Sequence, residues 1–297
     1  MNIIVFGKNG LVGHTCMTYF EGKGHTITGY SHAELDMTDH AAVMSLDIPD
    51  GSLVINCAAN VGGIFKNMNN GADMAYDNTL IDINLIVLAK RFPNSTFFMF
   101  SSTCAWGESM SSQNLNSLHS IKPHATNKHY AVQKRCLYYL RESVPNVILI
   151  TIPNLYGYYP NIFQNIENGH VIPSLLYKFM RANGRTVTVN GTGEPLRQFV
   201  YAKDIPRYIE YHFILNPGLR PDNVPFLVKP TEITIGQLVL LVKTATASLK
   251  NVVFTGNSSE NGTMRKKVDE SEGLNFVYTN IVVGLAETVA EINLYGA

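Results

Sequence analysis

The N-terminal stretch restricts the fold of this 297-residue chain more than any other part of the sequence. An apolar run over residues 3–6 leads directly into a loop with three glycines, residues 7–13, and a helical pattern starts at His14. The spacing Gly-x-x-Gly-x-x-Gly between a buried strand and a helix is typical of a dinucleotide site, because glycines let the backbone approach a pyrophosphate. The helix N-terminus adds free N–H groups and a positive dipole end. The residues predicted to bind the dinucleotide are Gly7, Asn9, Gly10, Leu11, Val12 and Gly13.

The end of the second predicted strand, residues 25–30, bears on the choice between NAD and NADP. An NAD enzyme presents a carboxylate there to the ribose hydroxyls, but the sequence has Tyr30, Ser31 and His32. The absence of a carboxylate favours NADP(H). Asn9 and His32 stand where an arginine would best hold the 2′-phosphate, so the preference rests on the missing carboxylate alone.

Apolar runs alternate with helical patterns over the first half of the chain. The strands predicted after the first one cover residues 25–30, 53–59, 96–100 and 147–152. Such alternation predicts an α/β fold, a Rossmann doubly wound parallel sheet. Regularity declines after residue 153. We therefore expect an NADP-binding Rossmann domain over residues 1–153, with a returning segment near 197–215, and a smaller α/β lobe over 154–297 that mainly binds substrate.

Bulk composition argues against several classes of partner. Formal net charge is zero and the pI is about 7.1, without a basic block, so neither nucleic acid nor a membrane surface is expected as a partner. No apolar run reaches the roughly 18 residues of a membrane span, and the opening strand does not resemble a signal peptide. The cysteines are too widely spaced for a zinc site or a disulfide framework, so no metal is expected. A cytoplasmic protein is the default.

The carboxyl ends of the predicted strands carry side chains suited to chemistry. Open α/β sheets bind their ligands beyond these ends. The third strand ends in small residues, among them Ala58, which let a cofactor pass close above them. The fourth strand is followed by Ser102, whose hydroxyl is able to hydrogen-bond a substrate carbonyl.

Tyr130 and Lys134 lie four residues apart in a helical pattern and therefore share one helix face. An ammonium that reaches toward a phenol favours the phenolate, which predicts a Tyr130 pKa below the ordinary value of about 10. Tyr-x-x-x-Lys also occurs by chance on amphipathic helix surfaces. Together with Ser102 and the glycine loop, the pair predicts a hydride-transfer site in which Tyr130 exchanges a proton with a carbonyl oxygen.

The sequence resembles the extended short-chain dehydrogenase/reductase family over nearly its whole length, and within it the epimerase-reductases of GDP-sugars. The motifs that carry the resemblance are Ala-x-Val-Gly-Gly-Ile at 59–64, Ser-Thr-Cys at 102–104, Tyr130 with Lys134, Asn-Leu-Tyr-Gly at 154–157, Gly-His-Val-Ile-Pro at 169–173, Gly-x-Gly-x-Pro-x-Arg at 191–197 and Gly-Thr-x-Arg-Lys at 262–266. The resemblance implies a bifunctional 3,5-epimerase and NADPH-dependent 4-reductase that converts a GDP-linked 4-keto-6-deoxy sugar, GDP-4-keto-6-deoxy-mannose, to GDP-L-fucose. It also implies a homodimer.

The same resemblance implies roles for individual residues. Ser102, Tyr130 and Lys134 would carry the reduction at C4. Cys104 and His170 would carry the epimerisations at C3 and C5. A C4 ketone acidifies the protons on both neighbouring carbons, so a base and an acid that flank the ring are able to invert each centre through an enolate. A thiol and an imidazole have pKa values near enough to neutrality to exchange protons in both directions.

Binding residues are implied as well. Cofactor contacts beyond the glycine loop and Ala58 fall to Tyr130, Lys134, Pro153, Asn154 and His170. The GDP-sugar is assigned to Asn154, Lys178, Arg197, Arg265 and Lys266. The family usually has arginine at the position of Lys178, so a bidentate phosphate clamp would become a single point charge here.

Other functions were weighed against this one. A GDP-sugar 4-ketoreductase, or a related nucleotide-sugar epimerase without the double epimerisation, would keep the reductase residues but does not need Cys104 and His170. A dehydratase would need an acidic pair after the strand-end serine, where the sequence has Thr103-Cys104-Ala105. A non-enzymatic NADP-sensing protein typically loses the tyrosine or the lysine, and both are present.

Overall fold

The computed structural model describes residues 1–106, 118, 122–164, 166, 169–216, 226–227, 231–265 and 276–296. At its centre is a parallel sheet of six strands, β1 (Asn2–Phe6), β2 (Thr26–Tyr30), β3 (Leu53–Asn56), β4 (Thr96–Ser102), β5 (Val147–Ile152) and β9 (Phe226–Leu227). Their order is β2-β1-β3-β4-β5-β9, and every neighbouring pair is parallel. The predicted doubly wound α/β sheet is confirmed.

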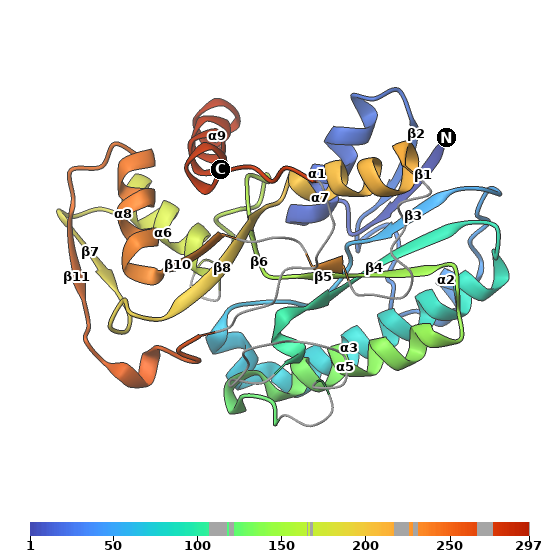
Figure 1. The fold of residues 1–297 in the computed structure, drawn as a ribbon, viewed down its shortest axis with the longest axis horizontal. Coiled ribbons are helices and arrows are strands. Elements are labelled where there is room, and N and C mark those ends of the chain that lie inside the picture. The colour runs from blue at the N-terminus through green and yellow to red at the C-terminus, as the bar shows by residue number, and fades with distance from the viewer. Residues whose placement is uncertain are drawn as a thin grey trace.

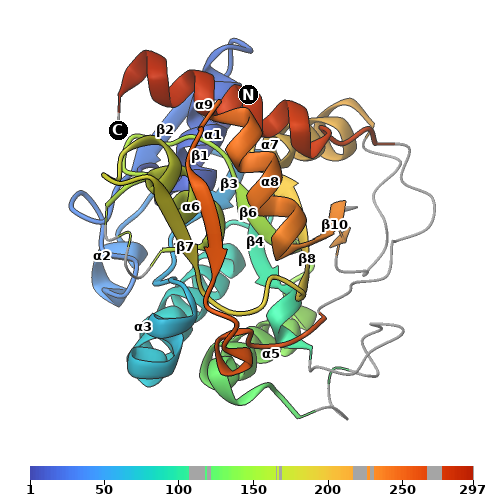
Figure 2. The ribbon, with the colours of Figure 1, turned by 90° about the vertical axis from the view of Figure 1, so that its left-hand side faces the viewer.

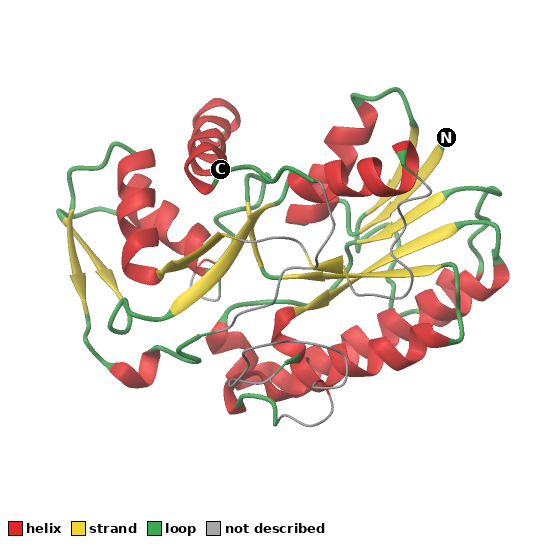
Figure 3. Ribbon diagram, in the orientation of Figure 1, coloured by secondary structure: helices red, strands yellow, loops and turns green. Residues whose placement is uncertain are grey.

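Helices cover both faces of this sheet (Figures 1 and 3). One face carries α1 (Leu11–Glu21), α7 (Asp204–Ile209) and the π-helical turn η4 (Glu210–Leu215). The opposite face carries α2 (His40–Met44), α3 (Ile64–Arg91) and α5 (Lys128–Glu142). Each face has its own apolar core, and strands β1, β3, β4 and β5 contribute apolar side chains to both. That double burial is the reason why continuous apolar runs mark these strands in the sequence.

The topology determines where a ligand binds. From β1 the chain passes to β2 on one side and then to β3 on the other side of β1. Ligands of doubly wound sheets bind beyond the carboxyl ends of the strands at such a switch point. Figure 1 shows that these strand ends point toward a second lobe, which is built from elements that follow β5 in the chain.

In the residues that the structure describes, the second lobe contains two small sheets with helices packed against them (Figure 2). Its strands are β6 (Asn154–Tyr156), β8 (Leu196–Tyr201) and β10 (Thr231–Thr234) in one sheet, with β7 (Thr186–Val189) and β11 (Asn251–Phe254) in the other. Its helices are α6 (Val171–Met180), α8 (Ile235–Ala245) and α9 (Ile281–Tyr295). Short 3-10 turns η1 (Thr103–Ala105), η2 (Ala125–Asn127) and η6 (Ser258–Glu260) complete the described elements. An apolar cluster of its own holds the lobe together.

The observed bounds differ from the sequence expectations in several elements. Strand β4 continues to Ser102 rather than ending at residue 100, and α1 begins at Leu11 rather than at His14. The third strand ends at Asn56 rather than at residue 59, because the Asn56 Oδ1 accepts a hydrogen bond from the Ala58 N–H at 3.1 Å and turns the chain. Helix α8 ends at Ala245, and Ala247 just beyond it takes a positive φ of 49° that a helix does not continue. In the part of the chain that the structure describes, no helix is long and apolar enough to cross a bilayer.

Candidate active site

The glycine loop joins β1 to α1 and packs tightly against the chain that follows β3. Gly7 has a φ of +77°, and a Cβ on it would lie 2.6 Å from the backbone nitrogen of Ala58. A Cβ on Gly13 would lie 2.1 Å from the Gly7 carbonyl oxygen. Gly10 is the N-cap of α1, and no side chain caps this helix end, which leaves its N–H groups for an anion. The loop therefore fits a dinucleotide pyrophosphate. It also carries the remaining residues predicted there, Asn9, Leu11 and Val12.

A hydrogen-bonded clamp fixes the chain beyond β3. Asn78 of α3 is 1% exposed and pairs with the backbone of Asn60 in both directions. Its Oδ1 accepts from the Asn60 N–H at 2.7 Å, and its Nδ2 donates to the Asn60 carbonyl at 2.9 Å. Both the oxygen and the nitrogen of this buried side-chain amide therefore have a hydrogen-bond partner. The clamp holds Ala58 against the glycine loop, beside the predicted cofactor position.

Three residues predicted to be catalytic meet where β4 ends. The Ser102 hydroxyl accepts a hydrogen bond from the Cys104 N–H at 3.2 Å and is hydrogen-bonded to Tyr130 as well. Cys104, in η1, is close enough to Tyr130 for an electrostatic interaction that raises the Tyr130 pKa. Side chains from β4, η1 and α5 therefore share one site at the carboxyl end of the sheet.

Lys134 lies one helical turn beyond Tyr130, as the spacing predicts. Its Nζ lies over the Tyr130 ring, 5.7 Å from the centroid. The pKa of Tyr130 is nevertheless raised: burial is the largest cause, and interactions with Cys104 and Asp82 add to it, against the hydrogen bond with Ser102. The prediction of a lowered Tyr130 pKa is wrong, because burial of the phenol disfavours the charged phenolate more than the hydrogen bond with Ser102 favours it. Tyr130 is a protonated phenol at neutral pH.

A buried carboxylate next to this pair was missed in the sequence. Asp82 of α3 and Lys134 of α5 are 4% and 5% exposed. The Gln133 Nε2 donates a hydrogen bond to the Asp82 Oδ2. Burial raises the pKa of Asp82, while the Lys134 ammonium and the Gln133 hydrogen bond lower it. Asp82 thus places a titratable group inside the α3–α5 interface, where it favours the phenol form of Tyr130. The signal in the sequence was an acidic residue among the apolar positions of a long helix.

His170 lies in the second lobe as the N-cap of α6, without a side-chain hydrogen bond to that helix. Its imidazole is accessible to solvent, yet the surrounding protein lowers its pKa through desolvation. The neutral ring is the form that accepts a proton. Cys104 follows β4 of the main sheet, so the two residues predicted to act in epimerisation belong to different lobes.

The link between the lobes contains two further predicted residues, Pro153 and Asn154. The Asn154 Nδ2 donates to the Gln198 carbonyl at 2.9 Å and so ties β6 to β8. One residue earlier on β8, Arg197 donates through Nη1 to the Leu196 carbonyl at 2.8 Å and through Nη2 to the Asn261 carbonyl at 3.0 Å. Burial lowers the pKa of Arg197, and the interaction with Cys104 raises it. The guanidinium is therefore within electrostatic range of Cys104.

The other cations predicted to bind substrate have protein partners. The Lys178 Nζ donates to the Thr188 carbonyl of β7 at 2.8 Å, and burial lowers its pKa. Arg265 forms a two-point ion pair with Glu232 of β10, at 3.0 and 2.8 Å, which raises the pKa of Arg265. Lys266 lies outside the described residues.

A cation that the sequence analysis passed over stands at the end of β2. The Lys8 Nζ lies 2.7 Å from a carboxylate oxygen of Glu34. Neither Asn9 nor His32 supplies a charge there: Asn9 is a neutral amide, and the exposed His32 ring faces Asp36, with Nδ1 3.7 Å from its carboxylate. With the glycine cradle and a lysine at the ribose end, the residues present fit NADP(H).

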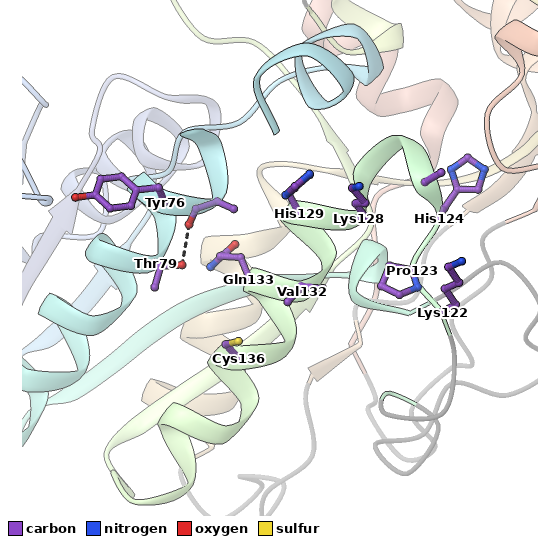
Figure 4. A pocket seen from close by; sticks show the side chains of 12 residues that line it. Tyr76, Thr79, Lys122, Pro123, His124, Lys128, His129, Val132, Gln133 and Cys136 are labelled. Atoms are coloured by element: carbon purple, nitrogen blue, oxygen red, sulfur yellow. Dashed lines mark hydrogen bonds between the residues drawn. The ribbon is translucent and has the colours of Figure 1, made fainter. Parts of the chain in front are cut away.

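A cavity of about 1000 Å³ opens between α3 and the start of α5 (Figure 4). Figure 4 shows Tyr76 and Thr79 of α3 on one side, with Val132 and Cys136 of α5 on the other. Gln133, the hydrogen-bond partner of Asp82, lines it too. None of the residues predicted to be catalytic lines this cavity, so it is separate from the site at the end of β4.

The fold and this site define a dinucleotide-dependent enzyme of the α/β class. The model of the NAD dependent epimerase/dehydratase family matches residues 3–213. The chain belongs to this family.

Several known proteins are similar to the chain over most of its length. A probable GDP-L-fucose synthase 1 from Oryza sativa subsp. japonica is 32% identical over 285 residues, which are 91% of this chain and 84% of that protein. A GDP-L-colitose synthase from Yersinia pseudotuberculosis is 29% identical over 235 residues, 75% of each. The crystal structure of a GDP-L-fucose synthetase from Naegleria fowleri bound to NADP superposes with a TM-score of 0.80 at 25% identity, covering 100% of this chain and 95% of that one. The family resemblance inferred from the motifs is confirmed.

Proposed function

We propose that the chain is a bifunctional enzyme, a 3,5-epimerase and NADPH-dependent 4-reductase that converts GDP-4-keto-6-deoxy-mannose to GDP-L-fucose. The observation that carries the proposal is the meeting of Ser102, Cys104 and Tyr130 at the carboxyl end of β4. A serine and a tyrosine suffice for a carbonyl reduction, and the thiol beside them adds a second proton-transfer group. The similarity to proteins named GDP-L-fucose synthase, and to a structure with bound NADP, supports the substrate and the cofactor.

The epimerisations come first, while C4 is still a ketone. One residue of the Cys104–His170 pair removes the proton on C3 or C5, and the other returns a proton to the opposite face of that carbon. The enolate between these steps carries negative charge on the C4 oxygen. The hydroxyls of Ser102 and Tyr130 are hydrogen-bond donors for this oxygen, and the Arg197 guanidinium supplies positive charge nearby.

The reduction ends the sequence. Bound NADPH supplies the hydride that C4 receives. Tyr130 donates its phenolic proton to the C4 oxygen, which Ser102 holds in place by a hydrogen bond. The Lys134 ammonium, over the tyrosine ring, stabilises the phenolate that remains. Because its pKa is raised, the phenol still carries this proton at neutral pH before it donates it to the C4 oxygen.

The two lobes divide the binding tasks in this proposal. We assign the cofactor to residues 1–153 with a returning segment near 197–215, and the GDP-sugar mainly to residues 154–297. Packing of α7 against α1 supports the assignment of the returning segment to the cofactor domain. Cys16, Cys57 and Cys136 are free thiols, which suits the reducing cytoplasm that we propose as its location.

Solvent exchange tests the epimerase half directly. In deuterated water with NADPH and GDP-4-keto-6-deoxy-mannose, we expect deuterium at C3 and C5 of the product. Cys104→Ser and His170→Asn should each slow this incorporation by about 10²-fold or more, the usual contribution of an acid–base residue. Cys136→Ser is the matched control, because Cys136 is an exposed thiol on α5. Mass spectrometry measures how much deuterium the product contains, and NMR shows whether it is at C3 or C5.

The outcomes separate this proposal from its rivals. Reduction without any incorporation would leave a GDP-sugar 4-ketoreductase. Incorporation that proceeds at the wild-type rate in both variants would remove the role assigned to Cys104 and His170. Absence of any reaction, with NADPH still bound, would point to another sugar substrate.

We also propose a homodimer that forms through α3 and α5. The large apolar side chains on these helices that are at least 40% exposed include two pairs, Tyr76 and Ile83 on α3 and Val132 and Tyr139 on α5. Each pair is seven residues apart and so lies on one helix face. A two-fold contact places the same surface of both copies together, which would remove these side chains from water.

Light scattering after size exclusion measures this association. The wild-type chain should elute with twice the mass of 32.9 kDa. Tyr76→Glu together with Val132→Glu should give the monomer mass, because charges on the shared face repel each other across a two-fold axis. Val282→Glu is the control, since Val282 is an exposed apolar residue on α9, away from this face. A wild-type monomer would contradict the proposal.

A further inference from the structure

Three hydrogen-bond donors converge on the carboxylate of Glu34. The Lys8 Nζ lies 2.7 Å from Oε1, while the Ser31 N–H and hydroxyl donate to Oε2 at 2.7 and 2.6 Å. The Lys8 hydrogen bond is the largest cause that lowers the pKa of Glu34 to about 2, followed by the two bonds from Ser31. The carboxylate is therefore ionised throughout the working pH range, and both of its oxygens accept hydrogen bonds.

These residues stand at the ribose end of the cofactor site. The N–H groups of Gly7 and Lys8 both donate to the Tyr30 carbonyl, at 2.8 and 3.0 Å, so the glycine loop is fastened to the end of β2. Doubly wound folds place the adenosine ribose there, and an acidic residue about 20 positions beyond the glycine motif contacts its 2′-hydroxyl in NAD enzymes. Glu34 comes at that distance after Gly13, although it lies four residues past the strand end where a carboxylate is usually sought.

The donor set is the kind that binds phosphate. An ammonium, a hydroxyl and a backbone N–H that point at one anion suit a phosphate dianion as well as a carboxylate. A 2′-phosphate at this position would need the donors that Glu34 holds and would be repelled by its charge. A free 2′-hydroxyl, in contrast, is able to donate to the carboxylate.

We propose that Glu34 sets the discrimination between NADPH and NADH, by competing with the 2′-phosphate for Lys8 and Ser31. Lys8 is the residue that recognises the phosphate, and it does so only when its ion pair with Glu34 opens. The preference for NADPH over NADH is consequently narrow in the wild-type chain. The inference rests on the proposed function for the cofactor alone and is independent of the sugar chemistry.

A structural role for Glu34 makes a different prediction. Ser31-x-x-Glu34 has the spacing of a capping box, and the Glu34 and Leu35 N–H groups donate to the Ser31 carbonyl at 3.1 and 3.0 Å. If Glu34 only closes this turn, its removal weakens NADP⁺ and NAD⁺ binding together. Competition with a phosphate instead predicts opposite effects on the two cofactors.

Calorimetric titration of the full chain with NADP⁺ and with NAD⁺, without sugar, tests the proposal. Glu34→Gln keeps an amide oxygen for the turn and removes the charge. We expect it to tighten NADP⁺ binding by about fivefold or more and to leave NAD⁺ unchanged or weaker, since one like charge is removed. Lys8→Met should weaken NADP⁺ by about tenfold, because it removes the cation, and change NAD⁺ little. Glu21→Gln, an exposed carboxylate on α1, is the control.

A second pair of ligands isolates the phosphate from the nicotinamide. Adenosine 2′,5′-bisphosphate and adenosine 5′-monophosphate, used as competitors, should show the same changes as NADP⁺ and NAD⁺. An unchanged or lower NADP⁺ to NAD⁺ affinity ratio in Glu34→Gln, or an equal loss of both cofactors in Lys8→Met, would overturn the inference. A wild-type chain that binds neither dinucleotide would instead overturn the proposed function itself.

Discussion

Replacing Tyr130 with phenylalanine is expected to lower kcat for the reduction by about 10²- to 10⁴-fold, the range that general acid catalysis contributes. The substitution removes the phenol that donates a proton to the C4 oxygen and keeps the ring over which the Lys134 ammonium lies. Binding of NADPH should therefore change little. Stopped-flow absorbance at saturating NADPH and sugar measures the rate, and a titration of NADPH fluorescence measures the binding.

The pH dependence follows from the direction of the pKa shift. Burial raises the pKa of Tyr130, so the phenol is protonated at neutral pH. An acid is lost only as pH rises through its pKa, and the reduction rate should not fall between pH 7 and about 9 on account of Tyr130. A rate that falls steeply across this window, and no longer does so in Tyr130→Phe, would show that Tyr130 titrates far lower in the working enzyme.

The control for this experiment lies on the same helix. Tyr139→Phe removes a hydroxyl from an exposed tyrosine of α5, nine residues beyond Tyr130, and should leave kcat at the wild-type value. A loss below about tenfold in Tyr130→Phe would contradict the acid role, since even a weak general acid contributes more than this.

Residues whose role depends on local sequence were predictable, and residues placed by tertiary packing were not. Strands β1, β3, β4 and β5 of the main sheet are apolar on both faces, so each carries its own signal over a few residues. The glycine loop and the Tyr130–Lys134 spacing are local in the same sense. Asp82 meets Gln133 across 51 positions of sequence, which only the packing of α3 on α5 reveals.

The end of β2 shows the same limit in a second way. The sequence has no carboxylate at Tyr30 to His32, but a turn brings the carboxylate of Glu34 back to Ser31. Its spacing from Ser31 is a recognisable capping signature. The contact with Lys8 joins residues 26 positions apart, and no pattern in either stretch indicates it. Electrostatic partners of a site are thus the part of it that local sequence conveys least.

A methyl group on Gly13 is expected to abolish cofactor binding at concentrations that saturate the wild type, with a loss of affinity of about 10²-fold. At an uncrowded position inside a helix, alanine is favoured over glycine by about 1 kcal/mol. Gly13→Ala in α1 would therefore stabilise the chain if there were space for the methyl group. It does not: the new Cβ would lie 2.1 Å from the Gly7 carbonyl oxygen and 2.9 Å from the Lys8 Cα. Either the loop or the start of α1 must move, at a cost of about 1–3 kcal/mol typical of overpacking.

The displaced loop is the cofactor cradle itself, so the effect on binding exceeds the effect on stability. Gly22→Ala is the matched control at the other end of α1, where φ is −63° and a Cβ would meet its nearest atoms at 3.5 Å, an ordinary contact. Thermal unfolding without cofactor should show a lower midpoint for Gly13→Ala only, and NADPH should raise the midpoint of the wild type and Gly22→Ala but not of Gly13→Ala. Normal NADPH binding by Gly13→Ala would contradict this prediction. It would show that the loop is able to relax, and that pyrophosphate binding does not require the close approach of Gly7 to α1.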